Sequence, residues 1–171
     1  MQATVEQLFI SSGHNFFGHH GKPAGINPTR EVDGLHCLAG RGVEGDRFLD
    51  YKPDYAGQIT FFEGEVFDAL SEALGLAGAT PAALRRNVVT RGLDLRALAG
   101  REFSLQGVWF RGAGECKPCY WMDAALAPGA ESWLHGRGGL RARILTEGWL
   151  RAGTAEVLTG AIAAMPASPA G

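Results

Sequence analysis

FSLQGVWF, residues 103–110, is the stretch that indicates the fold of this chain most directly. Its apolar residues alternate with other residues on both sides of Gln106-Gly107: Phe103, Leu105, Val108 and Phe110. Alternation with a period of two is the spacing of a β-strand, and a glycine between two such runs is typical of a hairpin or a bulge. The stretch therefore predicts two short strands joined by a turn or interrupted by a bulge.

Other short apolar runs predict strands on both sides of this stretch. They are residues 5–10, 59–62, 88–89, 142–145 and 157–158. Apolar residues at helical spacing then continue from Glu63 to Ala77, and Thr80-Pro81 predicts the start of a second, short helix. Residues 14–28 are rich in glycine and show neither period, so they predict a loop.

Strands and glycine-rich connections outnumber helices in this reading. The order predicts a mainly β fold with a few short helices (α+β), arranged as a closed or partly closed β-barrel rather than a doubly wound sheet. A length of 171 residues with 46% hydrophobic residues suits one domain with a sizeable core. We expect this single domain to span residues 1–160, and residues 161–171 to form a flexible C-terminal tail.

The formal charge of the chain is nearly balanced, with 16 Lys and Arg against 18 Asp and Glu, a net charge of -2. This balance argues against bulk attraction to nucleic acid or to an anionic membrane, so an anion site would have to be local. The chain has no leader-like N-terminus and no stretch long and apolar enough to cross a bilayer. Three cysteines, an odd number, favour free thiols in a reducing compartment, and we expect a cytoplasmic protein.

Cys119, within ECKPCYW (residues 115–121), has the most reactive chemistry available in the sequence. A cysteine reacts or ligates metal as its thiolate, and Lys117 together with the arginines of residues 137–143 would favour that ionised form. The segment therefore indicates a reactive thiol or a metal ligand. The alternative is that Cys116 and Cys119 are ordinary, partly buried thiols in a tight turn that contains proline.

The spacing Cys116-x-x-Cys119 has two further interpretations. It is half of a typical zinc site, but no second pair follows, so Cys37 with His36, or His135, would have to complete the site from a distance. It is also the spacing of a redox dithiol, which usually lies at a helix N-terminus after a strand and fits poorly with a proline between the thiols.

Three histidines fall within the glycine-rich loop of residues 14–28: His14, His19 and His20. Imidazoles are common metal ligands, but no regular spacing holds these three together. The loop predicts either a metal site or a solvated surface segment.

Two other segments have the composition of an anion site. The loop of residues 42–47 combines glycines with charged groups that would suit a close ligand; it equally suits a structural turn in which Asp46 accepts backbone hydrogen bonds and pairs with Arg47. The segment of residues 85–91 carries guanidinium, amide and hydroxyl groups on Arg85, Arg86, Asn87, Thr90 and Arg91. These groups suit a phosphate or a polar heterocycle, and the alternative is a solvated basic face.

Several short motifs follow one another along the chain: GVEGDRF (42–48), RNV (86–88), TRGLDL (90–95), GR (100–101) with Phe103, Pro118-Cys119, GRGG (136–139) and Arg143-Ile144. In this order they resemble the MOSC domain, which forms the C-terminus of molybdenum cofactor sulfurases and also occurs as small stand-alone bacterial proteins. The resemblance runs from about Val5 to about Leu158. No single motif is specific, whereas the ordered set is.

The resemblance implies a MOSC-type β-barrel with a pocket for molybdenum cofactor (molybdopterin). It implies that Cys119 is the catalytic cysteine, which either carries sulfur as a persulfide or ligates molybdenum directly. It also implies that the cofactor is bound by Gly45, Asp46, Arg47, Arg86, Asn87, Thr90, Arg91 and Arg137. Cys116 matches no family role, and one hypothesis is that it resolves a persulfide on Cys119 as a disulfide.

Two activities follow from the resemblance. In the first, the protein is a sulfur carrier or sulfurtransferase: a partner cysteine desulfurase loads sulfur on Cys119, which passes it to an acceptor. In the second, it is an oxidoreductase: the Cys119 thiolate binds molybdenum and the cofactor reduces small N-hydroxylated compounds, with a redox partner protein as electron donor. We expect no pyridoxal phosphate on this chain, because its lysines are Lys22, Lys52 and Lys117 and none lies in a recognisable pocket motif.

Two other classes of function stay open on the sequence alone. One is a zinc-binding or redox dithiol module that uses Cys116 with Cys119. The other is a non-catalytic barrel that binds an anionic metabolite or a partner protein through its arginine-rich segment.

Overall fold

The computed structural model describes residues 1–16 and 22–162. The strands in this part of the chain are β1 (Gln2–Ile10), β2 (Arg30–Glu31), β3 (Gly34–Leu38), β4 (Gly42–Val43), β5 (Ile59–Glu63), β6 (Val88–Arg91), β7 (Glu102–Leu105), β8 (Val108–Glu115), β9 (Leu140–Ile144), β10 (Gly148–Arg151) and β11 (Gly153–Thr159). The helices there are α1 (Gly64–Leu74), α2 (Trp121–Ala125) and α3 (Ala130–Leu134), with 3₁₀ turns η1 (Pro81–Leu84) and η2 (Arg96–Leu98). His19, His20 and most of the expected tail lie outside the described residues.

Seven of the described strands close into a barrel in the order β11-β7-β8-β9-β5-β6-β1, and β1 pairs back with β11. Neighbouring strands of this barrel are antiparallel except β5 and β6, which are parallel. β2 adds to β1 as an extra strand, and β3 lies between β10 and β4 in a separate sheet. The prediction of a mainly β, barrel-type fold is confirmed.

β7 and β8 form the hairpin expected at residues 103–110. Phe103 pairs with Phe110 across it, and Leu105 pairs with Val108. The turn is Gln106-Gly107, with φ angles of 51° and 81°. Two consecutive left-handed residues make the kind of tight turn whose twist matches that of the flanking strands, so the sequence placed this turn correctly.

The barrel interior is the main hydrophobic core. Phe61, Phe103 and Phe110 come from three different strands, and their ring centroids lie 5.2, 5.4 and 5.6 Å apart. All three side chains are fully buried. Because aromatic rings of this size fill the small barrel, its interior is a packed core, and ligand sites have to lie at its ends or on its outside.

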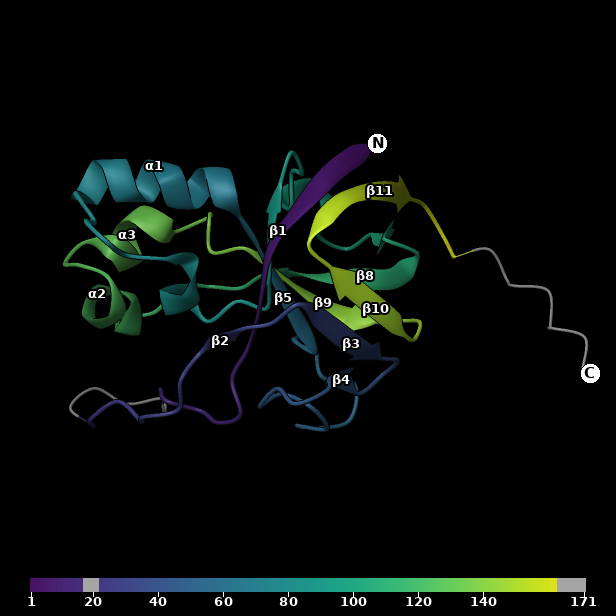
Figure 1. The fold of residues 1–171 in the computed structure, drawn as a ribbon, viewed down its shortest axis with the longest axis horizontal. Helices are drawn as coiled ribbons and strands as arrows, with labels where there is room; N and C mark the ends of the chain where they lie inside the picture. The colour runs from purple at the N-terminus through teal and green to yellow at the C-terminus, as the bar shows by residue number, and fades with distance from the viewer. Residues whose placement is uncertain (17–21, 163–171) are drawn as a thin grey trace, which may run out of the picture.

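The three helices of the described chain gather on one side of the barrel (Figure 1). A second core joins them to β5; its buried residues are Phe62, Phe67, Leu70, Leu84, Met122, Ala130 and Leu134. α1 ends where Gly75 adopts φ 63° and its N–H donates to the Ser71 oxygen, a common glycine stop. The helix therefore ends at Leu74 rather than at Ala77.

The sequence did not predict the three-stranded sheet or the helices α2 and α3. α2 and α3 have five residues each, which is less than two helical turns, so the helical period has no length over which to repeat. β4 has two residues, and β3 is specified by its pairing with β10, from more than 100 residues later in the chain. These elements are set by tertiary contacts.

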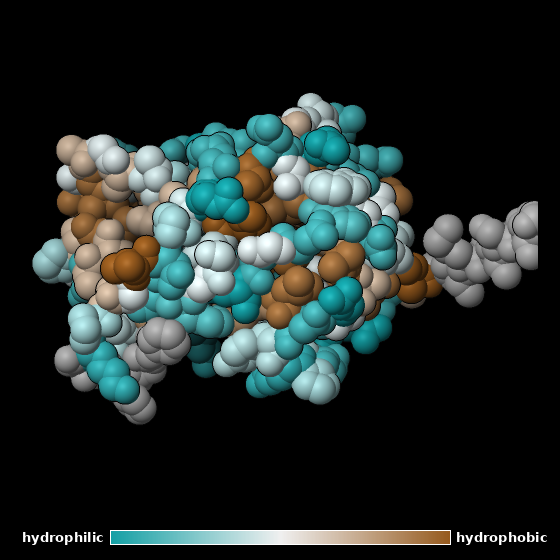
Figure 2. Space-filling view, turned by 60° about the horizontal axis from the view of Figure 1, so that its bottom comes forward, coloured by the Kyte–Doolittle hydropathy of each residue, from teal (hydrophilic) through white to brown (hydrophobic). Residues whose placement is uncertain are grey.

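The surface seen in Figure 2 is mostly hydrophilic or neutral, with hydrophobic residues in several separate groups. The large exposed hydrophobic residues are scattered: Met1, Ile26, Tyr51, Trp149 and Leu158. Exposed apolar residues of this kind are normal in globular proteins. Among the described residues, no helix is both long and apolar enough to span a bilayer.

Candidate functional site

Cys119 lines a partly open cleft with a volume of about 130 Å³. The cleft lies where four segments meet: the loop after β1, the loop after β4, the turn after η1 and the segment between β8 and α2. Its lining residues are His14, Asn15, Phe16, Arg47, Phe48, Leu84, Arg85, Arg86, Lys117, Cys119 and Met122. No carboxylate is among these described lining residues, so the wall is cationic and apolar.

Cys119 differs from Cys37 in its surroundings. Cys119 is exposed and lies just before α2, where its carbonyl oxygen accepts a hydrogen bond from the N–H of Met122, 2.9 Å away. Cys37 is fully buried in the barrel core, and burial raises the pKa of its thiol to about 12. A buried, protonated thiol is inert, so Cys37 is excluded as a reactive group, and Cys119 is the most exposed of the three thiols.

The loop after β4 is held by Asp46. The Asp46 carboxylate is buried and accepts hydrogen bonds from the N–H groups of Ser11 at 3.1 Å and Phe48 at 3.2 Å. It also pairs with Arg47 at 3.3 Å, while Gly45 takes the left-handed φ of 80° that the turn requires. Asp46 therefore has the structural role that was the alternative to ligand binding: it holds the turn. Arg47, in contrast, lines the cleft.

Arg47 and Arg85 contribute positive charge to the cleft from adjoining segments. Arg47 donates to the main-chain oxygen of Arg85 at 3.2 Å. Arg85 itself donates to Ser11 Oγ, Thr29 Oγ1 and the main-chain oxygens of Gly13 and Asn27, at 2.7 to 3.3 Å. Burial, followed by the charge of Arg47, lowers the pKa of Arg85 to about 10, so Arg85 stays protonated at neutral pH.

Arg85 was not among the cofactor-binding residues expected from the sequence. It lies directly before Arg86 and takes a left-handed φ of 55°, unusual for a residue with a side chain. This turn directs its guanidinium into the cleft. The only sequence signal was the Arg85-Arg86 pair, and the turn that separates the two side chains follows from the packing of η1.

Arg86 ties together the segments that surround Cys119. Its guanidinium is buried and donates to the main-chain oxygens of Leu84 at 2.8 Å, Gly138 at 3.1 Å and Cys116 at 3.2 Å. All three acceptors are neutral. Arg86 therefore adds charge to the cleft and also fixes the main chain on either side of the cysteine segment.

Asn87 and Thr90 lie inside the fold and do not line the cleft. The Asn87 side chain accepts from the N–H and hydroxyl of Thr60, both at 3.0 Å, and donates to the oxygen of Phe9 at 3.2 Å. The Thr90 hydroxyl donates to the oxygen of Phe62 at 3.4 Å. The resemblance implied that these two residues bind the cofactor; in the structure their side chains join β5, β6 and β1 through hydrogen bonds.

Arg91 and Arg137 also lie apart from the cleft. Arg91 pairs with Glu6 at 2.8 Å and Asp68 at 2.7 Å, and Arg137 stacks 4.4 Å over the Trp133 ring. The ion pairs of Arg91 direct its guanidinium toward Glu6 and Asp68, whereas Arg86 lines the cleft. The arginines of residues 85–91 are thus divided between the cleft, which Arg85 and Arg86 line, and the ion pairs of Arg91.

Aromatic rings form one margin of the cleft, a feature that the sequence analysis did not assign. The Phe48 ring stacks on Tyr55 with centroids 5.3 Å apart, while His14 and Tyr51 contact Phe48 edge-on at 4.9 and 5.3 Å. The Arg47 guanidinium lies 4.7 Å from the Phe48 ring centre. Burial lowers the pKa of His14, with a further contribution from Arg47, so the margin is mainly apolar at neutral pH.

Cys116 is half-buried beside the cleft and is not one of its lining residues. Across residues 1–16 and 22–162, no group of three or more His, Cys, Asp and Glu side chains lies close enough to hold a metal ion. The described residues thus assemble no closed zinc site around Cys116 and Cys119.

Comparisons with known proteins agree with this fold. The family model of the MOSC domain matches residues 19–156. The YuaD protein from Bacillus subtilis superposes with a TM-score of 0.71 at 22% identity, covering 94% of this chain and 98% of that one. YiiM from Geobacillus stearothermophilus (TM-score 0.65; coverage 93% and 75%) and YiiM from Escherichia coli (TM-score 0.64; coverage 94% and 71%) are each 16% identical. A search of curated proteins found no match. At these identities the superpositions establish the fold alone.

Proposed function

Because the chain belongs to the MOSC domain family, we propose that it binds molybdenum cofactor in the Cys119 cleft and acts as an oxidoreductase on small N-hydroxylated compounds. One observation carries the proposal: an exposed thiol shares a cleft with three arginines and a lysine, with no carboxylate among the described lining residues. Such a wall favours an anionic ligand, and the thiol favours one that carries a metal able to bind sulfur.

The donor chemistry of the cleft fits the cofactor. Cys119 would hold the metal, since thiolate sulfur is a soft ligand and is deprotonated when it binds. Arg47 and Lys117 would hold the phosphate, and Phe48 offers a flat apolar surface to the pterin. At about 130 Å³, the cleft is below the roughly 300–1,000 Å³ of pockets that enclose a drug-sized ligand, so part of the cofactor would extend beyond the rim.

The residues of the chain would bind and orient rather than react. The cofactor, when bound, would supply two-electron chemistry at molybdenum, and Cys119 would hold that centre at the segment before α2. Arg86 keeps this segment in place through the Cys116 oxygen, and Arg85 anchors the loop after β1 that forms the opposite wall. The open side of the cleft leaves room for a small substrate.

Sulfur transfer is a second candidate, favoured by the exposure of Cys119 at the edge of the cleft. In this reaction the Cys119 thiolate attacks the terminal sulfur of a persulfide on a cysteine desulfurase. The sulfur–sulfur bond of the partner breaks, a new one forms on Cys119, and the partner leaves as a thiolate. An exposed thiol is open to such a macromolecular donor.

The test is purification from a host that makes molybdenum cofactor, followed by measurement of molybdenum per protein. Cys119→Ser is expected to retain less than about a tenth of the wild-type molybdenum, with an unchanged circular dichroism spectrum. Cys116→Ser is the matched control and is expected to retain it. If Cys119→Ser retained its molybdenum, the proposal that Cys119 is the metal ligand would be wrong.

The same preparations distinguish the other candidates. Incubation with a cysteine desulfurase and cysteine, followed by assay of cyanide-reactive sulfur, measures persulfide on Cys119. Sulfur on Cys119 without molybdenum in the purified protein would support the carrier. Equal loss of bound metal or of stability in Cys116→Ser and Cys119→Ser would instead support a dithiol module.

A further inference from the structure

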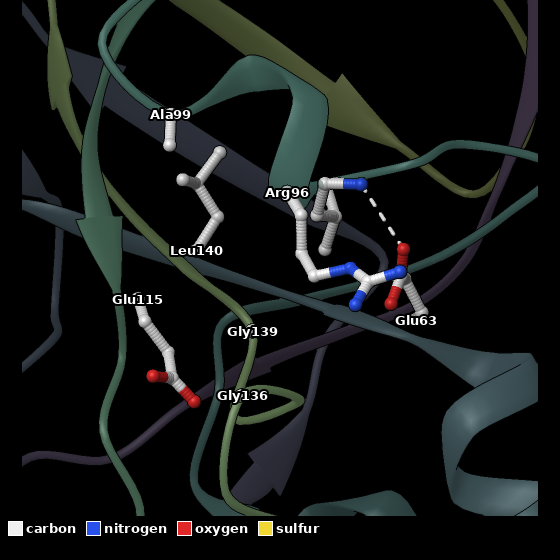
Figure 3. Close-up of a pocket in the computed structure, with 8 residues that line it drawn as sticks. Glu63, Arg96, Ala99, Glu115, Gly136, Gly139 and Leu140 are labelled. Carbon is white, nitrogen blue, oxygen red and sulfur yellow. Dashed lines mark hydrogen bonds between the residues drawn. The ribbon is translucent and has the colours of Figure 1, made fainter.

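A second cavity, with a volume of about 220 Å³, has none of its lining residues in common with the Cys119 cleft. Figure 3 shows the residues that line it. Glu115 and Gly139 line it. Their sequence neighbours Cys116 and Gly138 supply the main-chain oxygens that bind Arg86 in the cleft. The two cavities thus share the main chain between β8 and β9 as a border.

Two carboxylates enter this cavity from different strands (Figure 3). Glu63, at the end of β5, accepts a hydrogen bond through Oε1 from the N–H of Leu95 at 3.0 Å. Glu115, at the end of β8, accepts one through Oε1 from the N–H of Gly138 at 3.1 Å. Within the described chain, neither carboxylate has an ion pair or a second hydrogen-bond donor, so each Oε2 is available to a ligand.

The lining of the cavity carries more negative than positive charge. Two carboxylates face one guanidinium, that of exposed Arg96, which lies beside Glu63 in Figure 3 and makes no ion pair with it within 4.0 Å. Burial raises the pKa of Glu63, and the hydrogen bond from the Leu95 N–H is the main opposing effect. Of the nearby charges, Asp94 raises this pKa, while Arg96 and Glu65 act with smaller effects in opposite directions. A cation in the cavity would relieve this excess of negative charge.

The remaining wall is apolar and suits an organic body better than a bare metal ion. Leu95, Ala99 and Leu140 provide it, together with the backbone of two glycines. No third His, Cys, Asp or Glu joins the two carboxylates to complete a metal site among the described residues. A planar cation with several N–H donors can make two parallel hydrogen bonds to a carboxylate, while a flat apolar part packs on the leucines.

We propose that this cavity is a binding site for a small organic cation, an amidinium or guanidinium carried on a flat apolar body. The site is separate from the Cys119 cleft and does not depend on its function. Glu63 and Glu115 recognise the charged group, and Arg96 acts as a competing internal cation at the mouth.

Benzamidine is the probe, because it joins an amidinium to one aromatic ring. Titration by calorimetry or ligand-observed NMR is expected to show saturable one-to-one binding to the wild-type protein. Glu63→Gln and Glu115→Gln are each expected to weaken binding about tenfold or more. Glutamine keeps an oxygen that can accept the Leu95 or Gly138 N–H, so both variants are expected to fold.

Three controls isolate the cavity. Glu72→Gln removes the same charge from the exposed face of α1 and is expected to bind like the wild type. Arg96→Ala is expected to bind about threefold more tightly, because it removes the competing cation. Benzoate, which has the same ring with the opposite charge, is expected not to bind.

The proposal is overturned if benzamidine does not saturate the wild-type protein below about 10 mM, or if the variants of Glu63 and Glu115 bind as well as that of Glu72. Cys119→Ser protein is expected to bind benzamidine normally. Failure of this site and failure of the molybdenum site are therefore distinguishable.

Discussion

Replacing Arg86 by methionine tests whether this arginine holds the cysteine segment in place. The change leaves three main-chain oxygens without their donor, those of Leu84, Gly138 and Cys116. The bonds to Leu84 and Gly138 are buried and the bond to Cys116 is partly buried. An unsatisfied buried acceptor costs about 1–2 kcal/mol and a partly solvated one about 0.5 kcal/mol, so the loss is about 2.5–4.5 kcal/mol.

Part of this loss is offset, because the substitution also removes a buried charge whose hydrogen-bond acceptors are neutral. Taking about 1 kcal/mol for that relief leaves an expected destabilisation of about 1.5–3.5 kcal/mol. Urea denaturation followed by circular dichroism measures it. Arg101→Met is the control, since Arg101 is exposed and its side chain makes no hydrogen bond within the described residues; its expected change is within about 0.5 kcal/mol.

A loss below about 1 kcal/mol in Arg86→Met, or one equal to that of Arg101→Met, would refute the reasoning. Arg86 would then be free to act as a ligand contact only. Arg86→Lys adds a further check, because an ammonium keeps the charge but cannot reach three carbonyls with the planar fork of a guanidinium. Less than half of the lost stability is expected to return.

Three further predictions concern the thiols, the glycines and the acid range. In the folded protein, iodoacetamide followed by peptide mass spectrometry is expected to label Cys119 quickly and Cys37 hardly at all, because Cys37 is fully buried with its pKa raised to about 12; comparable rates would contradict this. Gly139→Ala is expected to cost more than about 2 kcal/mol in thermal or urea unfolding, since Gly139 has φ 90° and a Cβ there would lie 2.1 Å from an oxygen of β5. Gly107→Ala, with φ 81° and no atom within 4 Å of the new Cβ, is expected to cost about 1 kcal/mol, and similar losses at the two positions would contradict the close approach. Burial raises the pKa of Glu63 above its ordinary 4.5, so the folded state binds more protons than the unfolded state just above that pH. Its contribution to stability therefore falls as pH rises through this window, and Glu63→Gln is expected to remove that part of the pH dependence of unfolding.

The sequence was most informative where structure is local. The 103–110 hairpin follows from alternation around Gln106-Gly107, and α1 follows directly after the 59–62 strand, as the apolar spacing indicated. Each of these elements carries its own signal within about ten residues, a turn or a period. The neighbours of Cys119 and the order of the family motifs also marked this cysteine as the candidate reactive thiol, and the structure leaves it exposed at a cleft.

The composition of the site was less predictable than its existence. Arg86 and Arg91 lie in one short segment, yet only Arg86 lines the cleft, while Arg85 and Phe48 line it from positions that the resemblance did not assign to the cofactor. The second cavity combines Glu63 and Glu115, which come from strands separated in sequence and joined through β9. The sequence indicates which chemical groups are available, but it does not indicate which of them lie side by side in the folded protein.

The sequence by itself determined a barrel-type, mainly β chain and indicated one candidate thiol, because alternation, turn residues and residue chemistry are properties of a few adjacent positions. The tertiary structure alone decided which arginines surround that thiol and which carboxylates share the second cavity. Closing the barrel pairs β1 with β11 and brings β5, β8 and β9 together across about 80 residues of sequence. Contacts of that range depend on how all the strands pack at once, and no local pattern encodes them.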